Sequence, residues 1–292
     1  MRFEEIEKLS HEGFQLGLLC KLAGVSPSGF YSWKGRPESK RQLEDGVLKE
    51  RISVFFKESR KTYGVPRLRN ELKKEGMLVS KSRVQRLMKE LGITAKPKKK
   101  KKSPLTTVHK KGDRIAPRVF DDEEVKATKP NEVWASDITY IQTKVGFVYL
   151  LAIIDLYSRR VVGWSLRGHM EESLLTEAFQ EALAARDLGK LSVIFHSDQG
   201  SQFCANGFKK RLKLLNFEQS MSRRGNCYDN AYVESFWGTL KREIGVKVFD
   251  NEPHARKEIF DYIEGWYNTK RSHSSLGYLS PVEYEQSTGY AA

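Results

Sequence analysis

Cysteine is scarce in this sequence of 292 residues, and the cysteines that do occur are far apart. Cys20, Cys204 and Cys227 are odd in number and form no CxxC pair. The sequence therefore does not predict a small domain held together by disulfides. It is typical of a protein that stays in a reducing cytoplasm.

Long apolar runs are missing as well. Residues 1–8 are rich in charged side chains, and no stretch of about 18 apolar residues follows them. We therefore expect neither a signal peptide nor a membrane-spanning helix, and we predict a cytoplasmic protein.

Acidic residues are outnumbered by basic ones. The chain has 51 Lys and Arg against 37 Asp and Glu, which gives a net charge of +14. The usual partner of so basic a chain is a polyanion, most often nucleic acid. The alternative is a basic surface that only contacts water. The length allows two or three domains.

The shortage of acids is greatest after residue 96, because no acidic residue occurs before Asp113. Like-charge repulsion and two prolines keep this segment extended, so we predict a linker over residues 96–125. Its lysines, among them Lys98, Lys99 and Lys100, are expected to contact phosphates. A nuclear-localisation signal is the competing interpretation of such a run.

The beginning of the chain predicts two short helices joined by a turn, the plan of a helix-turn-helix. The first helix covers residues 15–23; Ser26 caps the second, which begins at Pro27 and reaches about Lys34. Many helical cores share this pattern without touching DNA. The second helix offers these side chains to a DNA groove: Ser28, Tyr31, Ser32 and Lys34.

A second helical module follows, with apolar stripes on three further helices. Pro66 opens one helix, Gly76 stops it, and Ser80 caps the next. The exposed faces carry basic residues suited to phosphates, although a merely solvated charged face is the alternative. These residues are Lys61, Arg67, Arg69, Lys73, Lys81, Arg83 and Arg86.

After Asn131 the pattern changes to strands. Runs near residues 133–141, 146–155 and 160–166 have short connections, which predicts an antiparallel meander. A helix over residues 171–186 then leads to a buried run at 191–195, which is expected to lie parallel to an earlier strand. A helix at 202–215, a short strand at 217–222 and a last helix complete the order of a ribonuclease-H-like α/β domain.

Three carboxylates stand at positions where this topology would gather them. Asp137 lies in the first strand, Asp198 closes the fourth, and Glu234 follows after 35 intervening residues on an amphipathic helix. Neighbouring carboxylates repel one another unless cations join them, and oxygen ligands favour Mg²⁺ or Mn²⁺. Two such ions suit phosphodiester chemistry. Lys241 lies two helical turns beyond Glu234.

The same residue types have simpler interpretations. An aspartate at a strand end is often a turn former, and a glutamate on a helix is often solvated. Composition does not exclude Asp155 or Asp229 from the site. His196 has the chemistry of a general base, but beside an apolar strand a hydrogen-bonded structural role is more common.

The sequence motifs around the three acidic residues are more specific. The segments Trp134–Tyr140, His196–Phe203, Gly225–Glu243 and Tyr267–Pro281, with Tyr63–Leu68 near the front, resemble the motifs of OrfB-type transposases of bacterial insertion sequences. These belong to the DDE transposase and retroviral-integrase superfamily. The resemblance covers nearly the whole chain. It implies a ribonuclease-H-like (integrase core) catalytic domain preceded by all-α helix-turn-helix modules that bind DNA.

The resemblance also implies an activity. Asp137, Asp198 and Glu234 would hold two Mg²⁺ ions, replaceable by Mn²⁺, and Lys241 would contact DNA near the cleaved phosphate. The enzyme would bind terminal inverted repeats, cleave their 3′ ends and transfer them to target DNA as a homodimer or higher multimer. A partner encoded by an upstream reading frame is a further expectation. The zinc module of retroviral integrases has no counterpart at the front of this sequence.

Two other functions stay open from the residues alone. One is a metal-dependent nuclease of the same fold that cuts DNA without joining it, and the other is a helix-turn-helix regulator with a decayed core. The predicted domains are a helix-turn-helix (1–38), a second helical module (39–95), the basic linker (96–125), the catalytic core (126–250), and a C-terminal helix and tail (251–292).

Overall fold

The structure is a computed structural model, and it describes residues 2–97, 116–119, 127–222, 231–245 and 248–290. The chain divides into two compact units, residues 1–53 and 54–292. Within the described ranges, no helix combines the length and the apolar character that crossing a membrane requires.

The first unit contains three short helices, α1 (Arg2–His11), α2 (Leu16–Leu22) and α3 (Pro27–Lys34), and the start of α4 (Lys40–Glu58). Their small core is made of Ile6, Cys20 and Phe30. The predicted cap of α3 is confirmed, because Ser26 Oγ accepts a hydrogen bond from Gly29 N at 3.0 Å.

The second unit begins with a helical module. Helices α5 (Val65–Lys74) and α6 (Lys81–Glu90) begin and end close to the predicted positions, and Ser80 caps α6 as expected. Their apolar stripes are fully or almost fully buried. The buried residues are Leu68, Leu72, Val84, Leu87 and Met88.

A five-stranded sheet forms the centre of the second unit, in the order β3-β2-β1-β4-β5. The predicted meander is confirmed: β1 pairs antiparallel with β2, and β2 with β3. The predicted parallel strand is confirmed too, because β4 lies parallel to both β1 and β5. The strands are β1 (Val133–Thr143), β2 (Gly146–Asp155), β3 (Val161–Arg167), β4 (Val193–Ser197) and β5 (Phe217–Met221).

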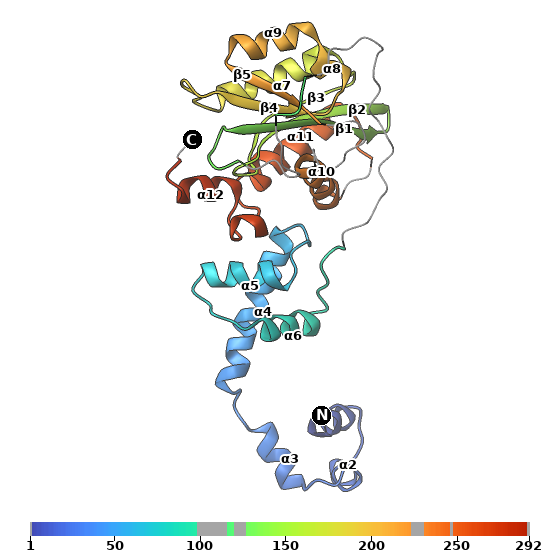
Figure 1. The fold of residues 1–292 in the computed structure, drawn as a ribbon. Coiled ribbons are helices and arrows are strands. Elements are labelled where there is room, and N and C mark those ends of the chain that lie inside the picture. The colour runs from blue at the N-terminus through green and yellow to red at the C-terminus, as the bar shows by residue number, and fades with distance from the viewer. Residues whose placement is uncertain (1, 98–115, 120–126, 223–230, 246–247, 291–292) are drawn as a thin grey trace. The chain divides into compact units, whose positions relative to one another are not determined.

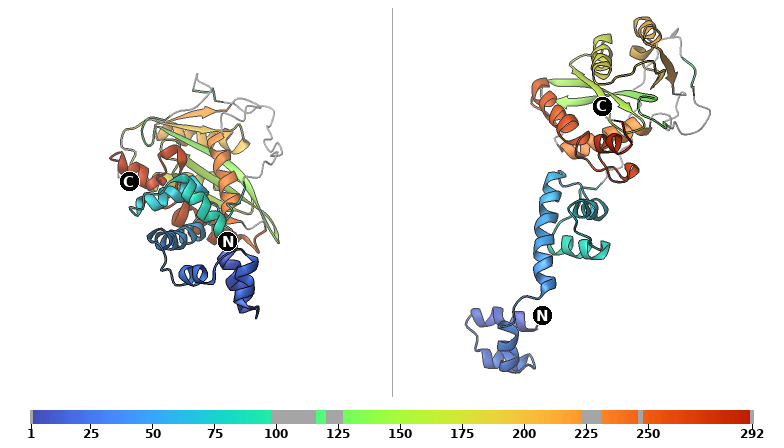
Figure 2. Two further views of the ribbon diagram at one scale, coloured as in Figure 1. Left: turned by 90° about the horizontal axis from the view of Figure 1, so that it is seen from below. Right: turned by 90° about the vertical axis from the view of Figure 1, so that its left-hand side faces the viewer.

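Helices cover both faces of this sheet, as Figures 1 and 2 show. One apolar cluster joins the sheet to α7 (Glu172–Ala184), α8 (Ser201–Cys204) and α9 (Asn206–Leu214). A second cluster joins the other face to α10 (Ala231–Ile244) and α11 (Glu252–Tyr262). The single helix expected at 202–215 is two helices, because Ala205 between them has an extended backbone with ψ 133°.

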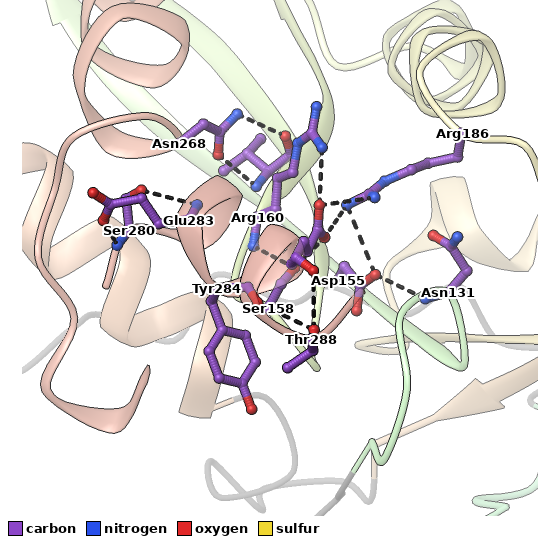
Figure 3. A network of polar contacts seen from close by, with 12 residues as sticks. Asn131, Asp155, Ser158, Arg160, Arg186, Asn268, Ser280, Glu283, Tyr284 and Thr288 are labelled. Atoms are coloured by element: carbon purple, nitrogen blue, oxygen red, sulfur yellow. Dashed lines mark hydrogen bonds and ion pairs between the residues drawn. The ribbon is translucent and has the colours of Figure 1, made fainter. Parts of the chain in front are cut away.

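The end of the chain returns to the sheet. A π-helical turn (Ile263–Tyr267) and a 3₁₀ turn (Ser274–Leu276) lead to α12 (Pro281–Ser287). Figure 3 shows the polar network that holds α12. Glu285 accepts hydrogen bonds from Ser158 Oγ at 2.6 Å and Arg160 Nη1 at 2.9 Å, and it also pairs with Arg186.

The sheet approaches a helix closely at Gly163 on β3. A Cβ atom there would lie 2.1 Å from the carbonyl oxygen of Ala178 and 2.8 Å from the amide nitrogen of Ala182, both on α7. We predict that Gly163→Ala lowers the free energy of unfolding by at least about 1 kcal/mol, because the backbone atoms of β3 and α7 would have to move apart.

Gly238 on α10 is the matched control, because a Cβ atom there meets nothing within 4 Å. Gly238→Ala should raise stability by about 0.5–1 kcal/mol, since glycine is unfavourable inside a helix. Urea denaturation of both variants measures the difference. A Gly163→Ala protein as stable as the wild type would contradict the packing described here.

Candidate active site

The sheet brings Asp137 and Asp198 to the same place. The parallel pairing of β1 with β4 ends at Ser136 opposite Ser197. Asp137 and Asp198 are the next residues on each strand, so both lie at the carboxyl end of this pair, where open α/β sheets commonly place their sites. The register of β1 and β4 alone therefore places these two carboxylates side by side.

Asp137 is held by two hydrogen bonds. Its Oδ1 atom accepts from the amide of Ile138 at 2.8 Å, and its Oδ2 atom accepts from Trp237 Nε1 at 3.0 Å. Burial, followed by the charge of Asp198, raises the pKa of Asp137 to about 7, although its two hydrogen bonds act to lower it. Two ionised carboxylates are therefore unfavourable here without a cation.

Asp198 leads into α8 through a tight turn. Its Oδ1 atom accepts a hydrogen bond from the amide of Gly200 at 2.9 Å. A Cβ atom at position 200 would lie 3.0 Å from that same oxygen, so a side chain there would crowd the carboxylate. This explains why glycine suits position 200.

Glu234 lies on the exposed side of α10, and burial raises the pKa of its carboxyl group. It also raises the pKa of Asp137, as the smallest of the contributions to that shift. Among the residues that the structure describes, no three acidic, histidine or cysteine side chains form a group that would hold a metal ion. The fold thus brings two of the three predicted ligands together and leaves the third on the adjoining helix.

The chemistry of these side chains fits a hard divalent cation. Asp137 and Asp198 offer carboxylate oxygens, which Mg²⁺ and Mn²⁺ prefer over nitrogen and sulfur ligands. Burial and then repulsion by Asp198 raise the pKa of Asp137, and such a cation would relieve this repulsion.

Lys241 reaches back to the same strand from the next turns of α10. Its Nζ atom donates to Thr139 Oγ1 at 2.6 Å and lies 5.1 Å from the ring centroid of Tyr140. Both partners follow Asp137 closely in β1. The predicted spacing of Glu234 and Lys241 therefore places a carboxylate and an ammonium group along one helix beside one strand.

Sequence reasoning assigned no role to Trp237 or Glu243, and both matter in the structure. Trp237 follows Glu234 by one helical turn, and its apolar spacing indicated only a core residue. Glu243 is 1% exposed and accepts hydrogen bonds from Tyr262, Trp266 and Arg271. The sequence did contain a signal for Glu243, because it lies close to the apolar stripe of its helix. A carboxylate that is buried there needs hydrogen-bond donors or a cation as partners.

Most predicted DNA-contacting residues of the helical parts lie on the surface. Arg67 is half-buried, with its guanidinium 5.4 Å from the ring centroid of Tyr63. A cavity of about 340 Å³ lies beside the N-terminus of α6 and includes Arg69 and Ser80 in its lining. The exposed residues are Tyr31, Ser32, Lys34, Arg69 and Arg86, and Arg83 is half-buried. Lys98, Lys99 and Lys100 lie outside the described residues.

The other candidates for the site were Asp155, His196 and Asp229, and the two that the structure describes are buried among structural partners. Asp155 is buried and accepts hydrogen bonds from the amides of Asn131 at 2.8 Å and Tyr157 at 2.9 Å, as Figure 3 shows for Asn131. His196 is buried, with its Nδ1 atom 3.0 Å from Ser220 Oγ. Asp229 lies outside the described residues.

Comparison with known proteins places this geometry in a family. Profiles described as "Integrase core domain" match residues 127–227 and 215–281, and one described as "HTH-like domain" matches residues 42–101. The transposase for insertion sequence element IS904 of Lactococcus lactis is 40% identical over 252 residues, which cover 86% of this chain and 98% of that protein. The chain belongs to the insertion-sequence transposases.

A second relative of this transposase agrees over a longer span. The transposase InsF for insertion sequence IS3A of Escherichia coli is 36% identical over 288 residues, which cover 98% of both chains. The predicted family and enzyme class, a DDE transposase/integrase, are thereby confirmed. The HTH-like match covers the second helical module, whereas the helix-turn-helix at residues 1–38 lies outside it and stays a prediction.

Solved structures of retroviral integrases also resemble the transposase. The catalytic core domain of the HTLV-2 integrase, in a complex with magnesium, is 17% identical with a TM-score of 0.43. The match covers 55% of this chain and 99% of that one.

His273 belongs to the buried cluster around Arg271. Its Nε2 atom lies 3.3 Å from Arg271 Nη1, which donates to it, and the side chain is 8% exposed. Burial and then the charges of Arg271 and Arg67 lower the pKa of His273 to about 2. The imidazole therefore stays neutral in the folded protein.

This depressed pKa predicts a dependence of stability on pH. Below pH ~6.5 the unfolded chain binds a proton on His273 that the folded chain does not, so stability is lost as the pH falls. Between pH 7.5 and 5.5, the wild type should lose about 1.4 kcal/mol more than His273→Gln, which keeps an acceptor but does not titrate. Urea denaturation at both pH values measures this. Parallel losses in the two proteins would contradict a neutral buried His273.

Proposed function

We propose that this transposase binds the terminal inverted repeats of its insertion sequence, cleaves their 3′ ends and joins them to target DNA. One observation supports the proposal above all: Asp137 and Asp198 adjoin at the end of the β1–β4 pair, and α10 carries Glu234 and Lys241 beside them. Cleavage and joining are the same type of phosphoryl transfer, so one set of side chains serves both steps.

In this proposal Asp137, Asp198 and Glu234 hold Mg²⁺ or Mn²⁺, two ions per site. When bound, the ions activate the attacking oxygen and stabilise the leaving 3′ oxygen. The chain's own contribution is placement. Trp237 fixes the orientation of Asp137 through its indole N–H, and the turn at Gly200 fixes that of Asp198.

The basic helical parts supply the DNA-binding surface in the proposal. Tyr31, Ser32 and Lys34 on α3 are exposed, as are Arg69 and Arg86 of the HTH-like domain. Pairing two element ends requires two copies of the chain, so a dimer or higher multimer is the expected active form. A protein from an upstream reading frame is a further proposed partner, and the bacterial nucleoid is the proposed location.

Single replacement of Asp137, Asp198 or Glu234 by Ala should reduce 3′ cleavage and strand transfer to below about a tenth of wild type, a barrier increase of more than about 1.4 kcal/mol. Binding of the terminal repeat should persist, because the metal ligands are separate from the helical modules. A labelled terminal-repeat duplex reports cleavage, joining and binding in the same reactions.

Asp261→Ala is the matched control, since Asp261 is an exposed acid on α11. It should keep wild-type activity. A triad variant that retains more than about a tenth of the activity would remove that residue from the site. Cleaved ends that never join target DNA would favour a nuclease over a transposase.

Lys241→Ala should reduce cleavage without changing the Mn²⁺ concentration needed for half-maximal activity. Lys241 lies about 10 Å along the helix axis from Glu234, too far to share its ion but suited to a neighbouring phosphate. Lys241→Arg should recover part of the activity, because phosphate accepts either cation in a different geometry. Titration of Mn²⁺ against cleavage compares the three proteins, and full recovery of the alanine variant by excess Mn²⁺ would assign the lysine to the metal site instead.

A further inference from the structure

Two large aromatic side chains are exposed where β1 and β2 form their hairpin. Tyr140 is 41% exposed and Phe147 is 53% exposed. Their rings meet edge to face, with centroids 5.6 Å apart and an interplanar angle of 88°. Aromatic rings are usually buried, because each carries a large apolar surface. Two in contact at the surface are therefore a contiguous apolar patch that the described part of the chain leaves exposed.

The register of the hairpin explains why these rings meet. Tyr140 pairs with Tyr149, and Phe147 pairs with Gln142, so the two aromatic residues are diagonal neighbours. Strand alternation turns both toward the face that Leu151 shares with α7. The patch lies at the hairpin end of this face, next to the two-residue turn in which Val145 is 80% exposed.

The patch lies further along β1 from the candidate active site, on the opposite face of the sheet from Asp137 and its partner Trp237. Tyr140 is the third residue after Asp137, about 10 Å along the same strand. Strand β1 continues past its pairing with β4, which ends at Ser136 and Ser197. Lys241 reaches this stretch of β1, with its ammonium group 5.1 Å from the Tyr140 ring centroid.

An exposed ring beside a fixed ammonium group matches the two parts of a nucleotide. The ring offers a π face on which any base can stack, and the cation offers a partner for the phosphate. A protein partner is the other occupant that an apolar patch can take. The cation in contact with the patch, beside carboxylates that suit phosphodiester chemistry, favours DNA.

We propose that Tyr140 and Phe147 form a stacking platform for one unpaired base of the DNA substrate next to the cleaved phosphate. The proposal rests on the proposed function, since it names the part of the DNA that this site holds. The base has to leave the duplex, because its faces are covered by its neighbours while it is paired. Leaving the duplex costs the stacking and pairing energy of the base. Enzymes that do chemistry on an extruded base stack it between aromatic or apolar side chains.

The platform would fix the register of the DNA end. A base held at Tyr140 and a phosphate held at Lys241 define two points on one strand of DNA, and Asp137 lies on the same β-strand as the first of them. Tyr140 and Phe147 thus contribute to placing the scissile phosphate, whereas the carboxylates act on it.

The test is a double-mutant cycle between the full-length protein and its DNA. One duplex carries the intact terminal repeat, and others carry a single abasic nucleotide at each of the three positions on either side of the cleaved phosphate. Affinities are measured in Ca²⁺ for the wild type, Tyr140→Leu, Tyr140→Phe and Phe147→Leu. Phe260→Leu on α11 is the control, because Phe260 is also an exposed aromatic residue.

At one position the abasic nucleotide should cost the wild type about tenfold in affinity, within the range expected for one stacked base. Tyr140→Leu and Phe147→Leu should show about the same tenfold loss on intact DNA and little further loss on that abasic DNA. Tyr140→Phe, which keeps the ring, should bind like the wild type, and so should Phe260→Leu.

Two results would overturn the platform. Either the leucine variants bind intact DNA as tightly as the wild type, or they lose equal affinity on intact and abasic DNA, which would indicate a structural or protein-protein role. If the wild type binds terminal repeats no better than unrelated DNA, the proposed function fails and the platform with it. If the protein binds and cleaves its ends but the Tyr140 substitution and the abasic nucleotide have independent effects on affinity, the platform is overturned while the proposed function stands.

Discussion

The buried pair of Glu243 and Arg271 fixes the helix on which the candidate site depends. Arg271 Nε lies 3.0 and 2.9 Å from the two carboxylate oxygens of Glu243, and the side chains of Tyr262 and Trp266 donate to the same carboxylate. Removing one partner of such a buried pair leaves a charge without compensation, which costs about 3–5 kcal/mol. Because Glu243 lies in the last turn of the helix that carries Glu234 and Lys241, this pair helps to set the position of α10 over the sheet. The C-terminal segment is thereby a structural part of the catalytic domain.

The buried acidic residues of the second unit differ in how their charge is compensated. Asp155 accepts hydrogen bonds from backbone N–H groups, yet burial raises its pKa to about 6. Glu285 is surrounded by Arg186, Arg160 and Ser158. Arg186 and its hydrogen bonds hold the pKa of Glu285 below its usual value despite burial. Asp137 behaves in the opposite way, because burial and the neighbouring Asp198 raise its pKa. Glu285 is paired with cations that stabilise this part of the fold, whereas Asp137 has a second carboxylate as its neighbour and lies where the proposed cation and phosphate would bind, which is common for functional sites.

Much of this arrangement was predictable because it depends on local chemistry. The caps at Ser26 and Ser80, the order of the strands, and the gathering of Asp137 with Asp198 follow from turn residues, periodicity and the rule for parallel crossovers. The break at Ala205 was not predictable from local sequence, since alanine favours helix and yet has an extended backbone here. The pairing of Glu243 with Arg271 joins residues 28 positions apart, and the bond from Trp237 to Asp137 spans 100 positions. Neither has a periodic signal, because each depends on how α10 crosses the sheet. Domain boundaries, ligand roles and DNA contacts stay predictions.

Helix α10 carries both the third carboxylate and the group that orients the first. Trp237 follows Glu234 by one turn, and its indole binds Asp137 while its ring is buried in the apolar cluster between α10 and the sheet. A shift of α10 along its axis would therefore move Glu234 and disturb Asp137 together. Lys241, a further turn along, is tied to Thr139 on the same strand. Two contacts to β1 on one side of the helix, with the Glu243 pair at its end, restrain sliding and rotation of the helix. Side chains carried by such supported elements keep the precision that the proposed phosphoryl transfer would require better than side chains on loops.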